Sequence, residues 1–207
     1  MLPIVITSLL PPVLGAAAES ILNFLEERLA AARGLEVKPR STTVRVFSAL
    51  GCAAVFLMAF LTAANPGQLA FRLISLSLCW VATMFDLRYR IIPNELILIL
   101  LATAAVSSLL GFTGADIISS LEGFLVCGVL FVVPFLFGKK VGGGDVKLAA
   151  AIGLCAGLQN ALLCIVIMGM LILLYTFVQK STFLSFLHQF IPMGPFVTAA
   201  YFLLLIR

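Results

Sequence analysis

The chain has 207 residues, of which 62% are hydrophobic and only 11% are charged, and its formal net charge at pH 7 is +4. An ordinary soluble domain carries about 25% charged residues. A water-soluble fold of this length could not hide apolar stretches that recur along nearly the whole chain. The composition therefore excludes a soluble globular protein and predicts an all-α, polytopic integral membrane helical bundle. We expect the lipid bilayer as its environment and no nucleic-acid partner.

Eight apolar segments can be drawn, and we expect six to eight of them to cross the membrane fully. A spanning helix needs about 20 residues to cross about 30 Å of hydrocarbon, so the sixth segment is short for a span. The first segment lacks a small-residue cleavage site and is interpreted as a retained span. No linker divides the chain, which predicts a single membrane domain over residues 1–207. The segments lie near 2–18, 44–63, 69–85, 96–112, 117–137, 146–158, 160–178 and 190–206.

Residues 19–43 separate the first two segments and carry several charges. Ile21, Leu22, Leu25 and Leu29 recur at helical spacing, which predicts an amphipathic helix on the cytoplasmic membrane surface. An alternative is that the glutamates of this stretch attract a basic peptide.

The positions of lysine and arginine predict the orientation. If all eight segments cross, all but two of the thirteen basic residues fall on one side, the exceptions being Arg72 and Arg207. The positive-inside rule places that side in the cytoplasm and the N-terminus outside. We therefore expect a multi-pass protein of the cell (inner) membrane.

A glycine run that ends in a carboxylate, Gly142-Gly143-Gly144-Asp145, stands before the sixth segment. A charge near hydrocarbon is costly, so an acidic residue at the mouth of a membrane helix marks a candidate site. The structural alternative is a helix N-cap, a position that aspartate favours. Three successive glycines exceed the needs of a cap, and they permit the close approach of another backbone, such as an extended peptide.

A second carboxylate, Asp86, ends the third segment. Its structural alternative is a juxtamembrane charge neutralised by Arg88 and Arg90, before Pro93 breaks the helix. Two membrane crossings separate Asp86 from Asp145, so both carboxylates are predicted to lie at the cytoplasmic face.

Two carboxylates at one place suit general acid–base chemistry. If their oxygens approach to about 3 Å, both cannot stay ionised and they share one proton. The ionised member then takes a proton from water while the protonated member donates to an amide carbonyl, and the pair titrates as a unit. The five cysteines lie inside apolar segments without C-x-x-C spacing, and the lone His188 has no nearby partner. We therefore expect no metal site and no cofactor.

These motifs resemble those of the type IV prepilin peptidases, which are membrane aspartic proteases of the G-x-G-D class. The resemblance covers roughly residues 70–207, the expected peptidase core. It implies that Asp86 and Asp145 are catalytic, and that the enzyme removes a short basic leader from pilin-like precursors on the cytoplasmic side of their hydrophobic segment. The stretches that carry it are Asp86, Arg90-Ile91-Ile92-Pro93-Asn94, Gly142-Gly143-Gly144-Asp145-Val146-Lys147-Leu148 and the proline-glycine stretch Ile191-Pro192-Met193-Gly194-Pro195-Phe196.

Six further residues match motif positions and are candidate substrate-binding residues. Two roles are open for Lys147. It either influences the protonation of the two aspartates or anchors the helix at the lipid headgroups, and we prefer the anchor. Larger members of this family carry two cysteine pairs in a cytoplasmic domain and also methylate the new N-terminus. Residues 19–43 hold no cysteine, so we expect no methyltransferase activity. The six residues are Pro93, Asn94, Gly142, Gly143, Gly144 and Lys147.

Two other kinds of function stay open at this point. Paired carboxylates also bind cations or relay protons in small membrane transporters, and the same fold could serve a catalytically inactive assembly factor of a pilus or secretion system. The sixth segment has a face of small residues, which predicts close helix packing around Asp145.

Overall fold

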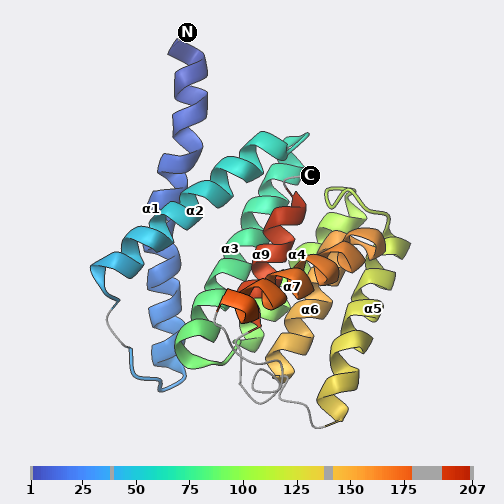
Figure 1. Cartoon of the computed structure of the whole chain (residues 1–207). Coiled ribbons are helices and arrows are strands. Elements are labelled where there is room, and N and C mark those ends of the chain that lie inside the picture. Colours follow the sequence, from blue (N-terminus) through green and yellow to red (C-terminus); the bar gives the residue numbers. More distant parts are fainter. Residues whose placement is uncertain (1, 38–39, 138–141, 179–192, 206–207) are drawn as a thin grey trace.

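The structure, a computed structural model, describes residues 2–37, 40–137, 142–178 and 193–205. All of its regular elements within these ranges are α-helices (Figure 1). Several residues singled out from the sequence lie outside the described ranges, namely Lys139, Lys140, Lys180, His188, Ile191, Pro192 and Arg207. The helices are α1 (Leu2–Ala32), α2 (Thr42–Thr62), α3 (Pro66–Tyr89), α4 (Asn94–Leu109), α5 (Ile117–Leu136), α6 (Gly143–Ala156), α7 (Leu158–Val178) and α9 (Gly194–Leu205).

Each predicted apolar segment corresponds to one of these helices. By length and composition, four of the described helices can cross a membrane: α2, α3, α5 and α7. The helices α4 and α9 are apolar but shorter, and α6 has only 14 residues. The helical membrane fold and the short sixth segment are therefore confirmed. The expectation of six to eight full spans is not confirmed, because four of the described helices have both the length and the composition of a span.

Helix α1 corrects the prediction of a separate surface helix at 19–43. It continues without a break to Ala32, because residues 16–32 are rich in strong helix formers such as alanine, leucine and glutamate. Leu22 and Leu29 pack against the core of the bundle, while Ile21 and Phe24 are exposed. The amphipathic pattern thus describes a helix that packs along the bundle.

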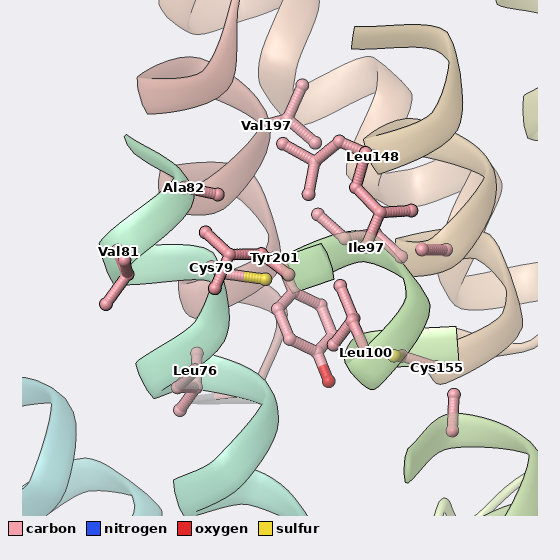
Figure 2. Close-up of a cluster of buried hydrophobic side chains, with 14 of the residues drawn as sticks. Leu76, Cys79, Val81, Ala82, Ile97, Leu100, Leu148, Cys155, Val197 and Tyr201 are labelled. Carbon is pink, nitrogen blue, oxygen red and sulfur yellow. The ribbon is translucent and has the colours of Figure 1, made fainter. Parts of the chain in front are cut away.

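The core lies where α3, α4, α6 and α9 meet. Tyr201 of α9 is fully buried there, and its ring lies among Cys79, Leu100 and neighbouring apolar side chains (Figure 2). Its hydroxyl is 3.3 Å from the Ser75 hydroxyl, which satisfies the polar end of a buried aromatic residue. All five cysteines are buried free thiols, as the sequence predicted.

Helices α5 and α6 approach each other through glycine. A Cβ added to Gly123 would lie 2.4 Å from the Gly153 carbonyl oxygen, and one added to Gly153 would lie 2.3 Å from the Gly123 carbonyl oxygen. Small residues permit this close approach. The predicted small face of α6 therefore packs on α5.

The arrangement of the helices brings several termini to one end of the bundle. Helix α3 ends there, and α4 and α6 begin there (Figure 1). Helix α9 is held beside α3 by a hydrogen bond of 2.8 Å from the Thr83 hydroxyl to the Thr198 hydroxyl. This end of the bundle holds both predicted aspartates.

Candidate active site

Both aspartates line one cavity of about 200 Å³. Its wall is formed by the end of α3, the turn into α4, and the glycine run at the start of α6. The expectation that two crossings return the chain to the same face agrees with this arrangement. The lining residues are Asp86, Arg90, Ile91, Ile92, Asn94, Gly142, Gly143, Gly144 and Asp145.

Asp86 lies in the last turn of α3 and is only 4% exposed. Its Oδ2 accepts a hydrogen bond of 2.9 Å from the backbone N–H of Gly194. A Cβ at Gly194 would lie 2.8 Å from that oxygen and 3.1 Å from the Asp86 Cβ. Glycine is therefore required for the backbone of α9 to reach the carboxylate.

A left-handed residue, four positions after Asp86, ends α3. Arg90 has a φ of 55°, and its N–H donates to the Asp86 carbonyl oxygen at 2.9 Å. Such a cap stops a helix and redirects the chain. The helix then restarts after Pro93, which is fully buried and does not line the cavity. The predicted break is confirmed, and Pro93 takes a structural position at it.

Asp145 is the third residue of α6, and Gly142 takes the N-cap position. The alternative of an Asp145 N-cap is therefore wrong, because the helix already starts at Gly143. From its third position the carboxylate reaches back, and its Oδ2 accepts the Gly142 N–H at 3.2 Å, as acidic residues do in a capping box. Among the residues that the structure describes, its buried Oδ1 has no hydrogen-bond partner.

The two carboxylates influence each other electrostatically. The pKa of Asp145 is raised to about 6, first by burial and second by the negative charge of Asp86, against the lowering effect of the Gly142 N–H. A buried carboxyl beside another carboxylate resists ionisation for these two reasons. The pair is thus set up to hold a proton near neutral pH.

The three glycines of the run have different surroundings. A Cβ at Gly144 would lie 3.0 Å from the Ile92 Cβ, and one at Gly142 would lie 3.0 Å from the Asp145 Oδ2. Among the described residues, a Cβ at Gly143 would meet only Phe135, at 3.9 Å, and Gly143 is exposed. The fold accounts for two of the glycines, whereas at Gly143 it leaves room for a side chain.

Lys147 and Asn94 join α6 to α4 at the edge of the cavity. The Lys147 ammonium donates to the Asn94 Oδ1 at 3.0 Å, and both side chains are exposed. Asn94 lines the cavity and Lys147 does not. The contact that the structure gives Lys147 is therefore with Asn94.

Behind the site, a buried ion network connects α1 to α3. Glu26 is 1% exposed and pairs with Arg40 and, at 2.6 Å, with Arg88. Arg40 also pairs with Glu19 at 2.7 Å. Arg88 thus binds Glu26, Arg90 interacts electrostatically with Asp86, and the glutamates at 19 and 26 take part in internal ion pairs.

Sequence reasoning missed two contributors to the site. Gly194 was noted only within a proline-glycine stretch, whose position near the last span was the available signal. The ion network was missed because its partners are 14 to 62 residues apart. The signal for it was the presence of Glu19 and Glu26 inside a long apolar helix.

Comparisons with curated proteins and with solved structures give no match. The family model of the type IV leader peptidases matches residues 73–178, which is just over half of the chain. This region includes Asp86, the glycine run and Asp145. The chain therefore belongs to the type IV leader peptidase family, and it is a multi-pass membrane peptidase.

Proposed function

We propose that this peptidase is an aspartic endopeptidase that removes the short basic leader from type IV pilin-like precursors. The observation that carries the proposal is the position of two buried carboxylates, Asp86 and Asp145, in one cavity at one end of the bundle. Family membership supplies the class of substrate. The positive-inside distribution of basic residues supports a cytoplasmic position for the cavity.

In this mechanism the pair of aspartates begins each cycle with one shared proton. The ionised member takes a proton from water, and the resulting hydroxide attacks the carbonyl carbon of the scissile amide. The protonated member donates its proton to the carbonyl oxygen. Collapse of the tetrahedral intermediate breaks the C–N bond. The newly protonated member gives its proton to the leaving amine, the other member takes a hydroxyl proton from the intermediate, and the pair again holds one proton. The base is assigned to the pair as a unit.

Two backbone N–H groups hold the aspartates in place. The N–H of Gly194 fixes Oδ2 of Asp86, and the N–H of Gly142 fixes Oδ2 of Asp145. Side chains that are locked before substrate arrives lose little freedom during the reaction.

We assign the glycine run to the substrate backbone. The scissile bond must be extended to enter a narrow site, and Gly143 offers an exposed backbone with no side chain in the way. Asn94 lines the same cavity and offers a neutral polar side chain to a substrate peptide group. Because residues 19–43 hold no cysteine, we propose peptidase activity without N-methylation.

The test is leader cleavage by the full chain in lipid vesicles. Asp86→Asn and Asp145→Asn should each lower the cleavage rate by at least about 100-fold, because each removes one partner of the proton transfer. Asp116→Asn is the matched control. Asp116 is exposed at the start of α5 and makes no side-chain cap bond, so its amide variant should cleave at the wild-type rate.

Three results would contradict the mechanism. Cleavage that persists in both aspartate variants would exclude the dyad. Cation flux that the same variants abolish, with no cleavage of several precursors by wild type, would favour the transporter alternative. Absence of both activities would favour an inactive assembly factor.

A further inference from the structure

An apolar groove of about 600 Å³ lies between α4 and α5, with α6 as its floor. Its walls are exposed aliphatic side chains, among them Leu98, which is 65% exposed, and Val129, which is 59% exposed. Asn94 and Lys147 are its polar lining residues, and both belong to the end of the bundle that holds the aspartates.

The groove is continuous with the aspartate cavity. Asn94 lines both of them, and Val146, which follows Asp145 directly, lines the groove. Along α4 the groove extends from Asn94 to Leu101, which corresponds to about 10 Å of helix. A chain that leaves the cavity toward the membrane interior therefore meets this groove first.

The depth of the groove is not a requirement of helix packing. Gly123, which is nearer the N-terminal end of α5 than Gly128 is, has no room for a Cβ because the backbone of α6 is in contact with it. Gly128 lines the groove, and a Cβ there would meet only the Ala150 Cβ, at an ordinary 3.6 Å. A glycine that its own fold does not need leaves space in which another helix can approach closely.

We propose that this groove binds the hydrophobic segment of the precursor that follows the cleaved bond. This inference rests on the proposed function, because it needs a substrate whose leader is in water and whose next segment is in the bilayer. An apolar helix face laid into an apolar groove is a common mode of recognition. Docking there would place the N-terminal end of the segment at Asn94, beside the aspartates.

A second apolar groove provides a matched control. It has a volume of about 420 Å³ and lies on the other side of α4, against α1 and α3. Ile74, Ser77 and Ile99 line it, and none of its described lining residues lines the aspartate cavity. A lipid acyl chain could fill either groove, whereas the precursor segment should fill only the first.

The first experiment compares two substrates in vesicles of phosphatidylethanolamine and phosphatidylglycerol. One is a precursor peptide with leader and hydrophobic segment, and the other ends a few residues after the cleaved bond. Gly128→Leu should raise KM for the long peptide about tenfold and leave kcat within about twofold, because it removes binding common to ground and transition states. With the short peptide, the KM and kcat of Gly128→Leu should equal those of the wild-type protein.

Ser77→Leu makes a small-to-large change in the control groove and should change KM and kcat for neither peptide. The docking proposal would be overturned if Gly128→Leu impaired cleavage of both peptides equally, or impaired cleavage of neither. Wild-type protein that cleaves neither peptide would overturn the proposed function instead, and docking is then decided by the second experiment.

The second experiment is photo-crosslinking in the Asp145→Asn background. A p-benzoylphenylalanine in place of Leu98 should capture the long precursor, and the same probe in place of Ile74 should not. Both positions are exposed, so the probes have similar reach. Adducts with lipid alone at Leu98, or capture from Ile74 alone, would show that the first groove does not hold the precursor.

Discussion

The backbone N–H of Gly194, at the start of α9, donates to the Oδ2 of Asp86 in the last turn of α3, at 2.9 Å and across 108 residues of sequence. Gly194 lies beyond residues 73–178, the part of the chain that the family model matches. The geometry of the first aspartate therefore depends on a helix outside the matched region.

Gly194→Ala tests this dependence. The added methyl group would be 2.8 Å from the carboxylate oxygen, so Asp86 or α9 must move. We expect kcat for leader cleavage to fall by about 10- to 100-fold, because small displacements of catalytic groups are costly. Gly169→Ala in α7 is the control, since nothing lies within 4 Å of a Cβ there. Equal activity of the two variants would contradict a positioning role for Gly194.

The pH dependence of cleavage should reflect the shared proton. With Asp86 ionised, Asp145 holds its proton up to a pKa of about 6, and above that pH the pair loses it. We expect kcat/KM to fall as the pH rises through this value, because the proton donor to the substrate carbonyl disappears. A rate that rises steadily to a plateau at pH 8 would contradict this assignment. The fitted pKa belongs to the pair.

The same shift predicts a pH-dependent stability. The folded-state pKa of Asp145, about 6, is above the ordinary value of 3.8 for an aspartate, so its contribution to stability is greatest below about pH 4 and is lost as the pH rises through about 6. Asp145→Asn keeps an acceptor for the Gly142 N–H and removes the buried charge. At pH 8 it should be more stable than wild type by up to about 3 kcal/mol, and the difference should shrink toward pH 4. Thermal unfolding in detergent measures it, and a pH-independent difference would contradict the prediction.

Alanine substitutions can separate the roles of the glycines. At Gly144 a methyl group would crowd Ile92 at 3.0 Å, so Gly144→Ala should lower stability, and Ile92→Ala should partly restore it in the double variant. At Gly143 the fold has room, so Gly143→Ala should unfold as wild type does. If Gly143 contacts the substrate backbone, the KM of Gly143→Ala for the precursor should nevertheless rise severalfold. Unchanged KM would exclude the assignment of the run to a substrate strand.

Much of the fold could be predicted from the sequence because hydrocarbon imposes strong rules. Apolar runs of sufficient length form helices, and counting crossings predicted that Asp86 and Asp145 lie at the same membrane face without any knowledge of packing. The details decided by side-chain contacts could not be predicted. Asp145 sits at the third helical position and not at the cap, because the backbone of Gly143 already has helical geometry. The buried ion pairs of Glu26 could not be predicted either, because its partners come from two other segments.

Glu26 provides the last prediction, on stability. It accepts from both Arg40 and Arg88 in a buried position, so Glu26→Gln removes the negative charge that these two cations share, while Arg40 keeps its ion pair with Glu19. Breaking a buried pair in this way costs about 3 to 5 kcal/mol, and thermal unfolding in detergent should show a large decrease. Glu27→Gln is the control, because Glu27 is half-buried and accepts from the Asn23 amide at 3.1 Å, a bond that glutamine can also accept. Arg88 is two residues from Asp86, so kcat should fall together with stability in Glu26→Gln. If stability falls and kcat is unchanged, the network holds α1 in place without positioning the aspartate.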